Sequence, residues 1–390
     1  MFRLSIALIA LYSVSIQARD IVFPPVAGYV PRHGAQQQLD SFSDSSDDVV
    51  IPGTFSGLVS FANLQYVDCL KGLEQGVLSD KEKFDIAILG APFDTGTTAR
   101  PGARFGPTGI RGASRRIEPD FAWSAYTGEN VFKSWAKIVD CGDAPLTFLD
   151  NTVALKQLDR AHKIVSGRPA NSSEYTTPRI IMLGGDHTTT LSALRSTFHH
   201  WGAVSVIHFD SHIDTWDPSH AVLTSSLNLS SGVNHGTFLH IAHEEGLIRN
   251  TSIHAGIRGP MSRPKGDVRN DIRCGFDMIK AREIDRLGTD GIIRRLKERI
   301  AGSKVYISVD IDVLDPAFAP ATGTPEVGGW TTRELFTILD GLSGIELIGA
   351  DIVEVAPVYD TAAETTSLAA AEVAHSLLAL MVQEPVASED

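Results

Sequence analysis

The sequence predicts an α/β fold in three layers (α/β/α), in which a mainly parallel central sheet lies between two layers of helices. Apolar runs of strand length recur along the chain, and most carry apolar residues on both faces of the expected strand. Such strands are buried on both sides, as in parallel sheets. Segments of helical length separate several of these runs, as crossovers between parallel strands require. Composition agrees with a globular protein, since 43% of the 390 residues are hydrophobic and 21% are charged.

The N-terminal segment is predicted to be a secretory signal peptide over residues 1–18. It has a positive charge at Arg3, an apolar stretch, and a small residue at Ala18, after which we expect cleavage. The alternative is a membrane anchor, but the apolar stretch is shorter than the roughly 20 residues that a spanning helix needs. We therefore expect a secreted, extracellular protein without a membrane partner after signal removal. Residues 19–50 are rich in Pro, Gln, Ser and Asp, which predicts a flexible extension.

A single catalytic domain is predicted over residues 51–385, followed by a short tail over 386–390, because no internal repeat or linker divides this part of the chain. Runs of alternating or continuous apolar character predict the strands. They lie at 84–90, 136–142, 179–185, 203–209, 251–257, 304–311 and 345–353. Helices are expected between several of them, including 151–165, 285–300 and 331–342.

Sequons and cysteines bear on the cellular compartment. Three N-x-S/T sequons agree with the secretory route and mark possible glycosylation sites; they are Asn171, Asn228 and Asn250. The three cysteines allow at most one disulfide, and none belongs to a C-x-x-C pair. Since a core of this size needs no covalent link, we expect three buried thiols at Cys69, Cys141 and Cys274.

The charge balance limits the class of partner. The formal net charge is −13, and no basic stripe is visible, which argues against nucleic acid as a partner. An acidic chain suits a small cationic substrate, although many unrelated proteins are as acidic.

Acidic and imidazole side chains collect where three predicted strands end. The segments are "RIIMLGGDHTTT", "VSVIHFDSHIDTW" and "VYISVDIDVLDP". Side chains at alternate positions share one face of an extended chain, and ligands of parallel sheets bind at the carboxyl ends of strands. These residues are therefore expected to converge on one site, and the candidate metal ligands are His187, Asp210, His212, Asp214, Asp310 and Asp312.

Two divalent metal ions explain this cluster better than one. Four carboxylates and two neutral imidazoles supply −4, which two divalent ions balance, whereas isolated buried carboxylates would be costly. Carboxylates with few imidazoles and no thiolate favour Mn²⁺, while Zn²⁺, Co²⁺ and Fe²⁺ stay open. Ca²⁺ is disfavoured because it prefers oxygen ligands. Two adjacent metals activate a water for hydrolysis.

The chain resembles the ureohydrolase family, the arginases and agmatinases, over essentially the whole of residues 51–385. The matching segments are "GGDHT" (184–188), "FDSHIDTW" (209–216), "NHGTFL" (234–239), "SVDIDVLDPAFAPATGTPEVGG" (308–329) and "DIVEVAP" (351–357). "APFDTGTTARPGARFGPTGIR" (91–111) resembles the agmatinase branch. The resemblance implies an arginase-like fold, a homo-oligomer (trimer or hexamer) and two Mn²⁺ per subunit.

The resemblance also implies roles for the ligands. One Mn²⁺ is expected on His187, Asp210, Asp214 and Asp310, and the second on Asp210, His212, Asp310 and Asp312. Asp214 is further expected to hydrogen-bond a metal-bridging hydroxide and to help move its proton.

Two more residues are expected to act on the substrate. His235 matches the histidine that protonates the departing amine, and Glu354 matches the carboxylate that receives the guanidinium group. Without the family, each would be an ordinary surface or strand-end residue. The reaction expected from the resemblance is hydrolysis of agmatine to urea and putrescine. Alternatives are 4-guanidinobutyrate, then arginine, and, in a different class, a non-catalytic guanidine or polyamine binder.

Four neighbours of these residues are not expected to bind metal. Asp186 is expected to hydrogen-bond around the ligands, and His208 and Asp315 to pack or to cap. Ser211 stands where the family commonly has alanine, and alternation predicts that its side chain points away from the ligands.

Overall fold

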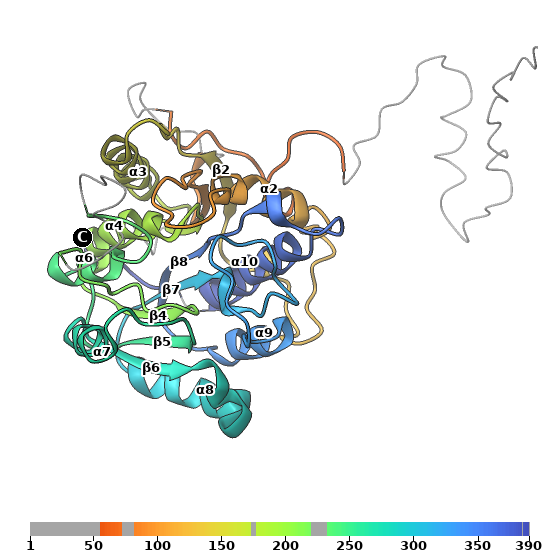
Figure 1. Cartoon of the computed structure of the whole chain (residues 1–390). Coiled ribbons are helices and arrows are strands. Elements are labelled where there is room, and N and C mark those ends of the chain that lie inside the picture. The colour runs from red at the N-terminus through yellow and green to blue at the C-terminus, as the bar shows by residue number, and fades with distance from the viewer. Residues whose placement is uncertain (1–54, 72–81, 173–176, 220–231, 384, 390) are drawn as a thin grey trace, which may run out of the picture. The chain divides into compact units, whose positions relative to one another are not determined.

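Eight strands in the described part of the chain form one sheet in the order β2-β1-β3-β8-β7-β4-β5-β6 (Figure 1). Every neighbouring pair is parallel, as expected for strands that are buried on both faces. The strands are β1 Ile86–Gly90, β2 Ile138–Asp143, β3 Arg179–Leu183, β4 Ser205–Phe209, β5 Ser252–Ile257, β6 Phe276–Lys280, β7 Val305–Asp310 and β8 Leu347–Val353.

The structure is a computed structural model of the chain. It describes residues 55–71, 82–172, 177–219, 232–383 and 385–389. The predicted signal peptide, the predicted extension over 19–50 and the sequon at Asn228 lie outside the described residues. Residues 53–390 form one compact unit.

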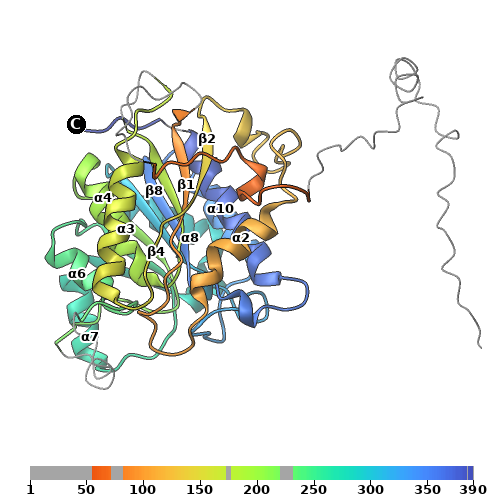
Figure 2. The same cartoon turned by 90° about the horizontal axis from the view of Figure 1, so that it is seen from above.

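Helices cover both faces of the sheet, which confirms the predicted three-layer architecture (Figure 2). The helices are α2 Gly106–Ser114, α3 Asn151–Ser166, α4 Thr190–Trp201, α6 Phe238–Glu244, α7 Pro264–Arg273, α8 Ile284–Ile300, α9 Thr332–Gly341 and α10 Thr365–Gln383. Apolar side chains of α3, α4 and α6 pack on one face, and those of α8, α9 and α10 pack on the other. α10 has the length and composition of a membrane span, but 72% of its apolar window is buried, as in a core helix.

Local signals explain where several helices begin. The Asp150 side chain accepts a hydrogen bond from Val153 N and caps α3. α9 begins at a capping box, in which Thr331 and Glu334 each bind the other's backbone N–H.

Two expectations from the sequence are wrong. The sequence reading missed β6, whose "FDMIK" is only partly buried and lies at the edge of the sheet. Cys69 and Cys141 are not free thiols but form a disulfide, whereas Cys274 is free and buried as expected. The disulfide links the loop before β1 to the edge strand β2, a proximity that residue spacing cannot reveal.

Candidate metal centre

Four neighbouring strands deliver the predicted site residues other than His235, which lies just before α6, to one edge of the sheet. In sheet order these strands are β3, β8, β7 and β4, and each is followed directly by site residues. β3 leads into a short 3₁₀ helix, His187–Thr189, and β7 leads into another, Ile311–Val313. Parallel strands present their carboxyl ends at the same edge, so residues far apart in the sequence meet there.

The first group of candidate ligands surrounds His187, which is fully buried. Its Nδ1 lies 3.1 Å from Asp210 Oδ2, 3.2 Å from Asp214 Oδ2 and 3.4 Å from Asp310 Oδ2. An imidazole nitrogen facing three carboxylate oxygens is a donor set suited to a divalent cation.

The second group shares Asp210 with the first. His212 Nδ1 lies 3.1 Å from Asp312 Oδ2 and 3.4 Å from Asp210 Oδ1. Asp210 therefore presents one oxygen to each group, as a carboxylate that bridges two ions would. The structure thus brings the six predicted ligands together, with Asp310 Oδ1 also accepting a hydrogen bond from Asp312 N at 2.8 Å.

Hydrogen bonds behind His187 fix which ring nitrogen faces the carboxylates. Ser308 Oγ donates its hydrogen to Asp351 Oδ1 at 2.6 Å. Since that hydrogen is used, Ser308 Oγ must accept a hydrogen bond from His187 Nε2, which lies 2.8 Å away. The hydrogen of the neutral ring is then on Nε2, and Nδ1 offers its lone pair. Among the described residues, His187 Nδ1, Asp210 Oδ2 and Asp312 Oδ2 are buried without a hydrogen-bond partner. Burying such atoms without a partner costs free energy, and metal ions bound by them would remove this cost.

The pKa values of the site residues also indicate that the cluster of carboxylates is stabilised by added positive charge. Burial lowers the pKa of the His187 imidazole, but the Asp210 and Asp214 carboxylates more than reverse this, so the pKa lies well above its usual value. Burial and the carboxylates of Asp312 and Asp210 raise the pKa of Asp310 well above its usual value. Two divalent cations would supply the charge that these groups otherwise obtain from protons.

The backbone is strained at two site residues. Asp214 has φ +50° and Glu354 has φ +61°, a left-handed conformation that non-glycine residues seldom adopt. β4 ends at Phe209, so the chain carrying Asp214 bends instead of alternating. The prediction for Ser211 is wrong for this reason, because its Oγ donates to Asp312 Oδ1 at 2.8 Å. Ile213, two residues later, is buried.

Glu354 and His235 lie next to the ligands. Glu354 Oε1 accepts from the backbone N–H of His187 at 2.9 Å and from His235 Nδ1 at 3.0 Å. Its Oε2 is buried and has no partner among the described residues. A buried carboxylate oxygen with a free lone pair is an acceptor for a cationic N–H donor.

His235 can be held in either protonation state. Its Nε2 accepts from Thr98 N at 3.1 Å when the ring is neutral, and the Thr98 hydroxyl, 2.8 Å away, can accept once Nε2 is protonated. Burial disfavours the charged ring, but Glu354 outweighs burial and raises the pKa of His235 to about 9. His235 can therefore store a proton near neutral pH.

The neighbours of the ligands behave as structural supports. Asp186 accepts from Gly96 N at 2.7 Å and Thr188 N at 2.9 Å, which ties the loop after β1 to the end of β3. Asp315 accepts from three backbone N–H groups, as expected for a capping residue.

Sequence reasoning missed several supporting residues. Glu326 Oε1 lies 3.6 Å from His212 Nε2, while Thr98 and Ser308 contact His235 and His187. A carboxylate behind a metal-binding histidine is a common arrangement, but nothing in the local sequence marks Glu326, Thr98 or Ser308.

Comparisons with known proteins identify the family of the chain. The family model described as "Arginase family" matches residues 84–380. The chain is 49% identical over 368 residues to "Putative agmatinase 1" of Schizosaccharomyces pombe, covering 92% of this chain and 91% of that protein. It is 35% identical over 302 residues to an agmatinase of Photorhabdus laumondii, covering 76% of this chain and 87% of the relative.

A solved structure shares the fold. Proclavaminate amidino hydrolase from Streptomyces clavuligerus superposes with a TM-score of 0.72 at 30% identity, covering 85% of this chain and 99% of that chain. Family, fold and the convergent histidines and aspartates point the same way, and this chain belongs to the arginase family.

Proposed function

We propose that this protein hydrolyses agmatine to urea and putrescine with two Mn²⁺ ions. The observation that carries the proposal is Glu354, whose buried Oε2 is free while its Oε1 is bonded to the backbone of the candidate ligand His187. This free acceptor lies beside the donor set for two cations. The relatives named as agmatinases and the "RPGARFGP" segment support agmatine over other guanidino compounds.

The metals would be held by the two groups around His187 and His212. Bound divalent ions would supply a hydroxide at neutral pH, because they lower the pKa of a coordinated water. Glu354 Oε2 would accept hydrogen bonds from the guanidinium N–H groups and hold the guanidinium carbon beside the two groups of candidate ligands. A hydroxide oxygen would first add to this carbon, and the bond from the carbon to the tail nitrogen would break afterwards. Asp214 would take up the proton that the added oxygen loses as the carbonyl group of urea forms. His235 gives its proton to the tail nitrogen, which leaves as a primary amine.

Urea release tests the proposal. Metal-free protein is loaded with Mn²⁺ and supplied separately with agmatine, 4-guanidinobutyrate and arginine, and Asp312→Ala serves as the control that lacks one ligand. We expect agmatine to give the highest kcat/KM and Asp312→Ala to be nearly inactive. No urea from any of the three would contradict a hydrolase, and a clear preference for arginine would contradict the agmatinase branch.

We also propose that the protein is secreted. The apolar segment after Arg3 has the pattern of a signal peptide, and the Cys69–Cys141 disulfide is typical of oxidising compartments. The sequon residues Asn171 and Asn250 are exposed, so a glycan at either position would not disturb the core.

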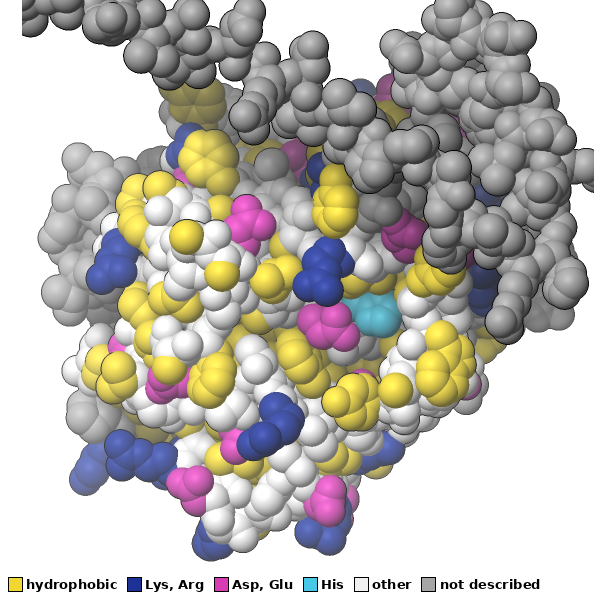
Figure 3. Space-filling view, turned by 90° about the vertical axis from the view of Figure 1, so that its right-hand side faces the viewer, with side chains coloured by type: hydrophobic (Ala, Val, Ile, Leu, Met, Phe, Trp, Pro, Cys, Tyr) yellow, Lys and Arg dark blue, Asp and Glu magenta, His cyan; other side chains and the backbone are white. Residues whose placement is uncertain are grey.

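We infer further that the chain forms a homo-oligomer, a trimer or hexamer. Large aromatic side chains are exposed on one loop, with Phe121 at 83%, Trp123 at 63% and Tyr126 at 93% exposure. Figure 3 shows one side of the molecule, where hydrophobic side chains reach the surface between charged ones. Light scattering coupled to size-exclusion chromatography tests this, and a monomer at micromolar concentration would contradict it.

A further inference from the structure

A chain of buried polar side chains leads from the metal centre to α7. His208 on β4 and His254 on β5 lie opposite each other in the parallel pairing and are fully buried. Their Nδ1 atoms share a hydrogen bond of 2.8 Å. On its other side, His208 Nε2 lies 3.1 Å from Asp210 Oδ2, an oxygen of the candidate bridging ligand. The two histidines, from two strands, therefore lie directly behind Asp210.

The other end of this chain is Asp271 on α7, which is only 2% exposed. Its Oδ1 accepts from His254 Nε2 at 2.9 Å and from Thr215 Oγ1 at 2.7 Å. Phe276 stacks on the His254 ring, with centroids 4.0 Å apart and an interplanar angle of 11°, which holds the ring in place. Thr215 directly follows the strained ligand Asp214. One carboxylate oxygen thus supports the chain segment of one ligand and the histidine pair behind another.

We propose that Asp271 is a positioning residue for the two-metal centre. Through Thr215 it holds the segment carrying Asp214, and through His254 it fixes the position of the His208 ring, which lies against Asp210. The inference rests on the metal site of the proposed function and adds a part of the fold, α7, that supplies no ligand. Groups that hydrogen-bond behind metal ligands fix the ligand direction, and their loss typically weakens metal affinity about 10- to 100-fold.

Packing alone does not account for this arrangement. Burying a carboxylate costs free energy unless its oxygens are hydrogen-bonded, and an apolar side chain would fill the same place at lower cost. Two further polar groups, His254 and Thr215, are buried to meet it, and His208 is buried against His254, all with no exposed surface. Orientation of the ligands is a function that an apolar cluster could not perform.

The test measures Mn²⁺ binding in the absence of substrate. Isothermal titration of metal-free full-length protein compares wild type with Asp271→Asn and Asp271→Ala. The matched control is Asp267→Asn, because Asp267 is equally buried on α7 and its side chain, among the described residues, bonds only Arg263 N and Nε, at 2.7 and 3.1 Å. We expect the dissociation constant to rise about 10-fold or more for Asp271→Ala, less for Asp271→Asn, and not at all for the control.

Unchanged Mn²⁺ affinity in both Asp271 variants would overturn the proposal, as would an equal loss in Asp267→Asn. If the metal-free Asp271 variants melt well below wild type, their weaker Mn²⁺ binding could reflect a loss of folding. Mn²⁺ binding by Thr215→Val then tests the proposal instead, because this variant removes one hydroxyl and no charge. Weakened Mn²⁺ binding in Thr215→Val supports the proposal, and unchanged binding overturns it. A wild-type protein that binds Mn²⁺ but releases no urea would contradict the proposed reaction alone, and the Asp271 comparison would still stand.

Discussion

At the residue scale, the two oxygens of Glu354 have different tasks. Oε1 is engaged by the His187 backbone and by His235, while Oε2 is left free in a buried position. Gly323 lies beside this free oxygen, since a Cβ there would be 3.6 Å from Oε2 and 2.8 Å from the backbone oxygen of Arg100. The absence of a side chain at Gly323 keeps room for a planar cation next to the carboxylate.

Glu354→Gln is therefore expected to weaken substrate recognition and to leave metal binding intact. The amide keeps the shape but loses the charge that strengthens its hydrogen bonds to a guanidinium. Charge-assisted hydrogen bonds contribute about 1.5–3 kcal/mol, so kcat/KM for agmatine should fall about 10- to 100-fold. Steady-state urea release measures this, and Glu334→Gln, which can keep its helix cap, is the control. Unaltered kcat/KM in Glu354→Gln would rule out the assigned role.

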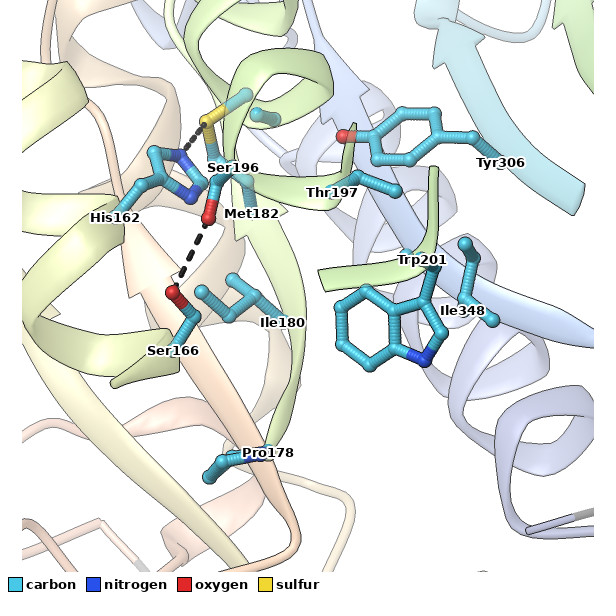
Figure 4. A pocket seen from close by; sticks show the side chains of 12 residues that line it. His162, Ser166, Pro178, Ile180, Met182, Ser196, Thr197, Trp201, Tyr306 and Ile348 are labelled. Carbon is cyan, nitrogen blue, oxygen red and sulfur yellow. Dashed lines mark hydrogen bonds between the residues drawn. The ribbon is translucent and has the colours of Figure 1, made fainter. Parts of the chain in front are cut away.

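The pKa of a second buried histidine, His162, is shifted in the opposite direction to that of His235. His162 on α3 lines a cavity of about 10 Å³, room for at most one water, with Ser166, Met182 and Trp201 (Figure 4). Its Nε2 lies 3.4 Å from Met182 Sδ. Burial lowers the pKa of His162 to about 4.

This pKa makes the stability of the protein depend on pH. His162 stays neutral in the folded state but takes up a proton in the unfolded chain below about pH 6.5. The unfolded state then binds more protons, so the free energy of unfolding falls as the pH is lowered from about 6.5 to about 4, by about 3 kcal/mol in total. His162→Met should flatten this part of the curve, measured by urea unfolding at several pH values. Parallel curves for the two proteins would contradict the prediction.

At the element scale, the sequence predicts strands well where both faces are apolar and poorly elsewhere. β3 and β7 were predictable because every residue in them is buried. The edge strand β6 was not, because buried and exposed residues alternate along it only in part. The ligands could be found because they follow such strands directly. The direction of Ser211 could not be predicted, since β4 ends one residue before Asp210 and the alternation of an extended chain ends with it. Thr98, Ser308 and Glu326 reach the site only through the tertiary fold.

The disulfide joins the loop before β1 covalently to the edge strand β2. The loop before β1 adds to the edge strand β2 through Val67 N, which bonds Asp140 O at 2.9 Å, and Arg168 binds the Cys69 carbonyl at 2.7 Å. A double variant, Cys69→Ala with Cys141→Ala, should lose about 4 kcal/mol, because the bond closes a loop with a sequence separation of 72. Denaturant unfolding measures the loss, with Cys274→Ala as the variant that keeps the bond. Wild-type stability in the double variant under oxidising conditions would contradict this.

At the scale of the whole molecule, the proposed secretion makes a specific prediction for the mature chain. Full-length sequence expressed in a eukaryotic secretory host should appear in the medium with Arg19 as its first residue, as cleavage after Ala18 requires. Exposed Asn171 and Asn250 should carry N-glycans, so that Asn→Gln at either position removes one glycan from the intact mass. Protein that stays in the cell and retains Met1 would contradict secretion.

The metal centre should also stabilise the whole fold, because its ligands come from three of the sheet's strands. Ions bound at the ends of β3, β7 and β4 would link segments that are more than 100 residues apart, as His187 and Asp310 are. They would also remove the repulsion among four buried carboxylates. A ligand that binds only the folded state at about 100 times its dissociation constant adds about 2.7 kcal/mol to the free energy of unfolding.

Removal of the metal with a chelator should therefore lower the melting temperature by about 4 °C, and added Mn²⁺ should restore it. Differential scanning calorimetry at several Mn²⁺ concentrations measures the shift. Asp312→Ala has lost one carboxylate from the second group, so its metal-free form should melt closer to its Mn²⁺-loaded form than the two wild-type forms do. If wild-type protein has the same melting temperature with and without Mn²⁺, the ends of the strands are stabilised without metal ions. The buried, unpaired atoms of His187, Asp210 and Asp312 would then need another partner.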